Sequence, residues 1–99
     1  MHVLETELEQ RWEAIFSALA AGDDVPPSTR LRTEGLMEAA ALQQVATCEA
    51  LQGAMDRSYQ RAFGRGLQDD FGPGWQALFP FPQIPAMMRR APVYPSTKD

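Results

Sequence analysis

The sequence is poor in the side chains that most catalytic and metal sites use. Its 99 residues include one cysteine, Cys48, and one histidine, His2. One cysteine cannot form an intramolecular disulfide, which favours a reducing compartment, and one cysteine with one histidine cannot form a zinc site. The paired carboxylates at 23–24 and 69–70 lack the spacing of a calcium-binding loop. We therefore expect no enzymatic activity, no cofactor, no metal and no small-molecule substrate.

Basic charge is also scarce. Nine Lys and Arg residues face 13 acidic ones, the formal net charge is −4 at pH 7, and Lys98 is the only lysine. Neither nucleic acid nor an anionic membrane is expected as a direct partner, because both require an excess of basic residues. No apolar run is long enough to cross a bilayer, and the first residues lack the basic and apolar regions of a signal peptide. Together these absences predict a cytoplasmic protein.

What the sequence does contain begins with an amphipathic helix, predicted over residues 3–21. Its apolar side chains recur at spacings of three and four, and they are Leu4, Leu8, Trp12, Ile15, Phe16 and Leu19. Gly22 and the Asp-Asp-Val-Pro-Pro run at 23–27 end this helix.

A second, much longer helix is predicted over residues 28–64. From Leu36 onward its composition is mainly Ala, Leu, Gln, Glu and Met, which are strong helix formers, although Gly35 leaves the first turns doubtful. Such a helix would be about 50 Å long, longer than a compact domain of this size is wide. We expect it to pack along its length against a second copy, which predicts a homodimer.

Two rows on this long helix suit contact with another helix. The apolar row consists of Met37, Ala41, Val45, Cys48, Leu51, Met55, Tyr59 and Ala62. On that row Cys48 is expected to be buried and inert. Ala39, Ala46 and Gly53 repeat every seven residues. Gly53 either lets another helix approach closely or is simply tolerated, and both interpretations stay open.

A basic stripe marks the end of the long helix. Arg57, Arg61 and Arg65 follow each other at intervals of four. They form either a solvated face that complements the negative end of the helix dipole or a contact with acidic groups of a partner.

Residues 67–91 form an aromatic and proline-rich arm, and residues 92–99 form a tail. A short helical turn is predicted at 75–79, and the alternation of apolar residues with proline at 79–85 forces extended backbone. The arm either folds back over its own helices or crosses onto a second copy or a partner, where aromatic, Met and Arg side chains are enriched. The whole chain, 1–99, is thus predicted to be a single all-α domain.

The residues expected at a partner or dimer interface come from the apolar row, from the small and basic residues beside it, and from the arm. They are Met37, Val45, Cys48, Leu51, Gly53, Met55, Tyr59, Arg61, Trp75, Phe79, Phe81 and Ile84.

The layout of the chain resembles the QslA family, small helical antiactivators of LuxR-type quorum-sensing regulators in Pseudomonas. The likeness lies in Leu-Glu-Thr-Glu-Leu-Glu-Gln-Arg-Trp at 4–12, in Leu-Met-Glu-Ala-Ala-Ala-Leu at 36–42, and in Phe-Pro-Phe-Pro at 79–82. It covers most of the chain and includes no signature motif.

The resemblance implies a homodimeric all-α protein that binds the ligand-binding domain of the transcription factor LasR. Binding would cover the surface that LasR uses to dimerise, and a monomeric regulator cannot engage a two-fold operator. The resemblance assigns no individual contact residue. The alternative function is that of a dimeric secretion chaperone or adaptor that holds a client segment in an apolar groove.

Overall fold

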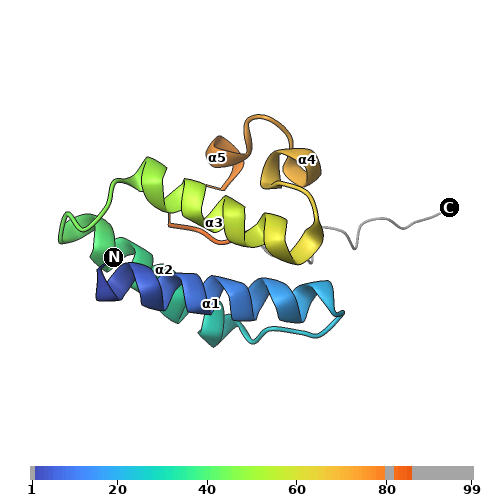
Figure 1. The fold of residues 1–99 in the computed structure, drawn as a ribbon, viewed down its shortest axis with the longest axis horizontal. Coiled ribbons are helices and arrows are strands. Elements are labelled where there is room, and N and C mark those ends of the chain that lie inside the picture. Colours follow the sequence, from blue (N-terminus) through green and yellow to red (C-terminus); the bar gives the residue numbers. More distant parts are fainter. Residues whose placement is uncertain (1, 80–81, 86–99) are drawn as a thin grey trace, which may run out of the picture.

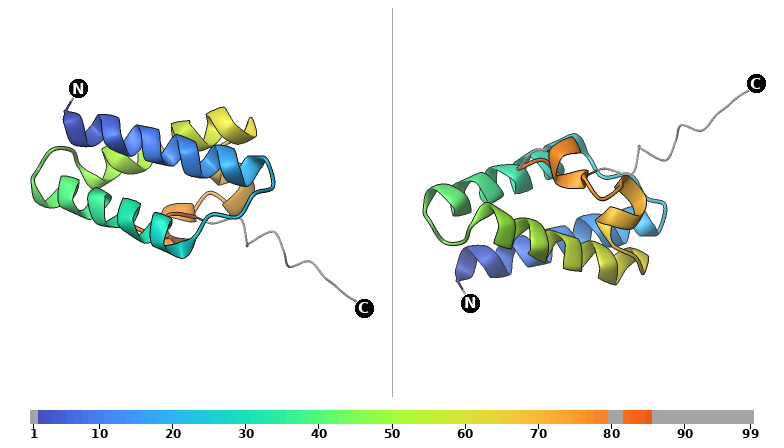
Figure 2. Two further views of the ribbon diagram at one scale, coloured as in Figure 1. Left: turned by 90° about the horizontal axis from the view of Figure 1, so that it is seen from below. Right: turned by 90° about the horizontal axis from the view of Figure 1, so that it is seen from above.

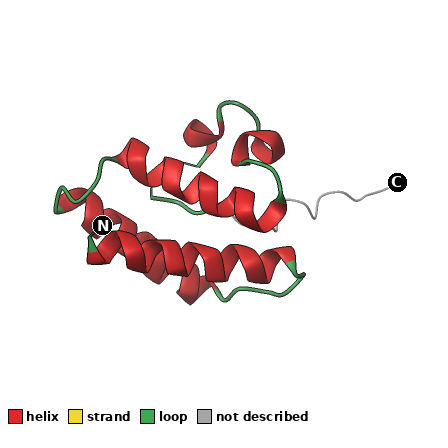
Figure 3. Ribbon diagram, viewed as in Figure 1, coloured by secondary structure: helices red, strands yellow, loops and turns green. Residues whose placement is uncertain are grey.

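The computed structural model of the chain describes residues 2–79 and 82–85. Within these residues the fold is all-α and contains no strand (Figure 3). The elements are α1 (Val3–Ala20), α2 (Pro27–Leu42), α3 (Cys48–Phe63), α4 (Leu67–Phe71) and α5 (Trp75–Leu78). Helix α1 packs against both α2 and α3, and the two short helices follow α3 (Figure 1). None of the helices in the described part is long and apolar enough to cross a membrane.

Helix α1 is fixed at both ends by local hydrogen bonds. The N-cap residue is His2, whose Nδ1 accepts the N–H of Leu4 at 3.0 Å, while the Glu5 carboxylate accepts the N–H of His2 at 3.1 Å. This is a capping box with a histidine in the place of the usual Ser or Thr. At the other end Gly22 adopts a φ of 89°, a left-handed conformation that glycine tolerates, and the helix stops at Ala20.

The single helix expected over residues 28–64 is instead two helices separated by residues 43–47. The C-terminus of α2 closes in a Schellman motif, in which the Val45 N–H donates to the Ala40 carbonyl at 2.9 Å and the Gln44 N–H donates to the Ala41 carbonyl at 3.1 Å. The motif requires a left-handed residue, and Gln44 supplies it with a φ of 59°. Helix α3 then begins after Thr47, whose hydroxyl accepts the Ala50 N–H at 3.0 Å.

This break changes the shape of the domain. Helix α2 runs back along α1, and α3 runs the opposite way, so the chain folds onto itself instead of extending as one rod (Figures 1 and 2). None of the described helices exceeds 18 residues, so an overlong helix gives no reason to expect a homodimer.

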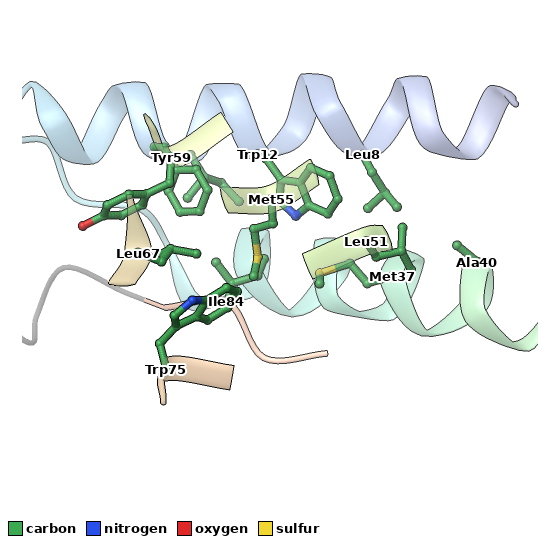
Figure 4. Packing of buried hydrophobic residues seen from close by; sticks show 12 residues of the cluster. Leu8, Trp12, Met37, Ala40, Leu51, Met55, Tyr59, Leu67, Trp75 and Ile84 are labelled. Carbon is green, nitrogen blue, oxygen red and sulfur yellow. The ribbon is translucent and has the colours of Figure 1, made fainter. Parts of the chain in front are cut away.

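One hydrophobic core joins all five helices and the segment 82–85. Its buried members are Leu8, Trp12, Ile15, Phe16, Met37, Ala40, Leu51, Met55, Tyr59, Leu67, Trp75 and Ile84. Figure 4 shows Trp75 and Ile84 beside Met55 and Leu67. The Ile84 N–H donates to the Glu34 carboxylate at 2.8 Å, which links this segment to α2 across 50 positions of sequence.

The described part of the arm is therefore folded back over its own helices. Trp75, Phe79 and Ile84 are each at most 6% exposed. Of the two arrangements considered for the arm, this one holds for residues 67–79 and 82–85. Phe81 and the tail 92–99 lie outside the described residues.

A hydrogen-bonded cluster connects the end of α3 to α4. Tyr59 donates its phenolic O–H to the Asp70 carboxylate, and the Arg65 guanidinium donates to the other oxygen of the same carboxylate. Burial by itself would raise the pKa of Asp70, but the hydrogen bonds from Arg65 and Tyr59 outweigh it and hold that pKa below its usual value. The ionised carboxylate is thus the form that stabilises this junction.

Replacing Asp70 with asparagine should flatten the acid side of the stability profile. A carboxyl whose pKa is lower in the folded state contributes stability above its unfolded pKa of about 4, and that stability is lost as the pH falls through the folded pKa. Thermal unfolding followed at several values between about pH 6 and pH 2 should show a shallower decline for Asp70→Asn than for the parent. Asp69→Asn is a suitable comparison because, among the described residues, Asp69 accepts the Gly66 N–H at 2.9 Å and bonds to neither Tyr59 nor Arg65. Parallel acid limbs for the parent and Asp70→Asn would contradict the assignment.

Candidate interaction surface

The structure places most of the predicted interface residues inside the core of this chain. Seven of them are buried, namely Met37, Leu51, Met55, Tyr59, Trp75, Phe79 and Ile84. Val45 and Gly53 are half-buried, Cys48 and Arg61 are exposed, and Phe81 lies outside the described residues. These residues form no common exposed patch within the described chain. The prediction that they contact another molecule stays a prediction.

Cys48 is exposed, although the sequence analysis expected it to be buried. The expectation assumed that residues 37–62 share one helical register. Because residues 43–47 interrupt the helix, Cys48 is the first residue of α3 and does not continue the apolar row of α2. The prediction that Cys48 is buried was wrong because residues 37–62 do not form one continuous helix.

The small-residue row and the basic stripe are also interrupted. Ala39 lies on α2, Ala46 in the connection and Gly53 on α3, so they do not line up along one helix. The nearest atom to a Cβ added at Gly53 is Nη1 of Arg57, at 3.6 Å, and no second helix of the described chain approaches there. Arg65 lies beyond the end of α3, where its guanidinium bonds to Asp70.

The surface that sequence analysis missed is the outer face of α2. Leu31, Gly35, Glu38 and Leu42 follow each other at intervals of four, three and four and are all exposed. We call these four residues the α2 outer stripe. Leu31 is 64% and Leu42 77% exposed, and together with Val3 they are the large apolar side chains that the described chain leaves in water. On the opposite side of α2, Thr33, Met37 and Ala40 are fully buried.

This stripe combines exposed leucines with a helical glycine, and both features disfavour the isolated domain. Gly35 lies inside α2, where glycine costs about 1 kcal/mol relative to alanine. A Cβ added at Gly35 would meet nothing within 4 Å, so no contact within the described chain requires the glycine. Gly35 leaves room for another helix to approach this face next to Leu31, and Glu38 is the polar side chain between the glycine and Leu42.

Replacing Gly35 with alanine should stabilise the isolated protein by about 0.5–1 kcal/mol, because alanine has the higher helix propensity and space for its methyl group is open. The melting temperature should rise by several degrees. Gly64→Ala is the matched control, since space is also open there but Gly64 has a φ of 76°. That left-handed conformation should make the same substitution destabilising by about 1–2 kcal/mol. A destabilised Gly35→Ala protein would show that something within the chain covers this face.

The described residues contain no group of three His, Cys, Asp or Glu side chains close enough to hold a metal ion. Comparisons with protein-family models, with curated proteins and with solved structures give no match to this chain. The candidate site is the α2 outer stripe, which is identified by its exposure.

Proposed function

We propose that this protein is an antiactivator that binds the ligand-binding domain of a LuxR-type regulator, LasR in the case of the family that the sequence resembles. The observation that carries a binding function is the α2 outer stripe, which leaves Leu31 and Leu42 exposed around a helical glycine. The choice of partner comes from the resemblance at 4–12, 36–42 and 79–82. Such a regulator acts in the cytoplasm, where one unpaired cysteine is compatible with the reducing conditions.

The mechanism requires only that α2 covers an apolar surface of the partner. A helix that offers residues at intervals of four, three and four can lie in a shallow groove of another helical surface. If that surface is the one through which two regulator subunits pair, bound and dimeric forms exclude each other. A regulator held as a monomer binds a two-fold operator weakly, because it can contact only one half-site at a time.

Gel filtration with the purified ligand-binding domain tests this proposal. At micromolar concentrations we expect a complex that elutes ahead of both components and a matching loss of the regulator's own dimer. Separate elution of the two proteins would overturn the choice of partner. A chaperone or adaptor would instead retain an unfolded client segment and leave the folded regulator unchanged.

We also propose that the protein is a homodimer. The support is the exposed apolar surface of α2, because a small domain commonly covers such surface with a second copy. A second copy on this stripe would compete with the regulator for it. Light scattering should give about twice the 11.0 kDa mass of one chain. A monomer mass across a wide concentration range would contradict self-association without affecting the binding of a different partner.

A further inference from the structure

An apolar groove of about 260 Å³ lies between α1 and the start of α2, on the side of α2 away from the outer stripe. Its walls are Ala14, Ile15 and Ala18 from α1, Val25 and Pro26 from the connection, and Thr29 from the first turn of α2. Thr29 and Leu31 are two residues apart, which corresponds to about 200° around the helix axis. A molecule in the groove therefore does not compete for the stripe.

The groove has room because α1 contributes the small side chains of Ala14 and Ala18 to its wall. Ala14 and Ala18 are one turn apart and flank Ile15, which is buried and forms the floor. At this end the groove is lined by Val25 and Pro26, which belong to the connection between α1 and α2. The space is smaller than the roughly 300–1,000 Å³ of pockets that enclose whole ligands. Its size suits one large side chain of a partner.

The charges at the two ends of the groove are unequal. Arg11 is already balanced, because its Nε lies 2.8 Å from the Glu7 carboxylate. Asp24 is exposed and has no ion-pair partner among the described residues, and the exposed Asp23 precedes it. A cation on an incoming segment would therefore find an available carboxylate at this end.

We propose that this groove is a docking site for a linear segment of a partner protein in which a large aliphatic or aromatic side chain lies next to Arg or Lys. The apolar side chain fills the space above Ile15, and the cation pairs with Asp24. A large side chain seated in a pocket often carries most of the binding energy of an interface, and a charge pair at the rim adds selectivity. The proposal does not depend on which regulator, if any, binds the α2 outer stripe.

Titration of the full-length, isotope-labelled protein with short capped peptides tests the proposal by NMR. The probes are Ala-Trp-Arg-Ala, Ala-Trp-Glu-Ala and Ala-Ala-Arg-Ala. We expect the first to shift amide signals of Ala18, Val25 and Thr29 and to bind about two- to fivefold tighter than the second, which is the range of an exposed ion pair. The third should produce no saturable shift. Shifts that map elsewhere, or equal binding of the tryptophan and alanine peptides, would overturn the proposal.

Two variants separate the contributions of shape and charge. Ala18→Phe fills the groove with its own ring and should abolish binding of the Trp-Arg peptide, whereas Ala20→Phe places the same ring on an exposed part of α1 and should leave binding unchanged. Asp24→Asn lies in a loop, keeps the fold, and should erase the preference for Arg over Glu. Retained binding in Ala18→Phe, or a retained preference in Asp24→Asn, would contradict the assigned site.

Discussion

Replacing Tyr59 with alanine is expected to destabilise the protein by about 3–5 kcal/mol, which is a large share of the roughly 5–15 kcal/mol that holds a small domain together. Tyr59 is fully buried and joins three elements. Its ring centroid lies 5.2 Å from that of Phe16 on α1, 4.4 Å from that of Phe63 on α3 and 6.3 Å from that of Phe71 on α4. Removing the ring leaves a cavity at the point where these helices meet. Thermal unfolding should show a melting temperature lower by about 15 °C or more.

Tyr59→Phe separates the ring from its hydroxyl. This variant keeps the aromatic packing but removes the O–H that donates to Asp70, so we expect a loss of only about 0.5–1.5 kcal/mol. Burial, followed by the hydrogen bond to Asp70, raises the pKa of Tyr59 well above its usual value. The protonated Tyr59 hydroxyl therefore contributes to the free energy of unfolding below about pH 10, and this contribution is lost as the pH rises further. Equal destabilisation by Tyr59→Ala and Tyr59→Phe would show that the hydrogen bond, and not the ring packing, holds this junction.

The first helix could be predicted well from the sequence because its signals are local. Leu8, Trp12, Ile15 and Phe16 lie on the predicted apolar face of the first helix, and all four are buried in the structure. Gly22 ends that helix in the left-handed conformation for which glycine is the usual residue. Periodicity and a glycine stop depend on neighbours along the chain, so they can be recognised without a tertiary structure.

The break between α2 and α3 could not be predicted because its turn uses residues that usually favour helices. Gln44 takes the position that glycine or asparagine normally occupies in a Schellman motif, and only the Thr47 cap offered a local signal. Missing this break moved the expected interface onto residues such as Met55 and Tyr59, which lie in the core. The position of Ile84 beside Glu34 depends on a contact over 50 residues and has no signature in the local sequence.

Changing both Leu31 and Leu42 to glutamate should weaken binding of the regulator's ligand-binding domain by about 100-fold. Each leucine removed from the centre of an interface costs more than about 1 kcal/mol, and a glutamate that must be desolvated there adds to that cost. A combined loss of about 3 kcal/mol corresponds to that factor in the dissociation constant. Both side chains are mostly exposed in the isolated chain, so its free energy of unfolding should change by no more than about 0.5 kcal/mol. Calorimetric titration gives the affinity, and thermal unfolding checks the fold.

The decisive comparison is a variant that adds the same charge elsewhere. Gln10→Glu with Ser17→Glu also introduces two negative charges at exposed helical positions, but it places them on α1 and leaves the α2 outer stripe intact. If the stripe is the contact surface, this control should bind within about twofold of the parent, because dispersed surface charge is screened beyond about 10 Å at 0.1 M salt. Equal weakening of the two double variants would instead assign the effect to net charge, which is already −4 in the parent. Undiminished binding of the Leu31→Glu, Leu42→Glu protein would remove α2 from the interface, while absence of binding by the parent would reject the partner itself.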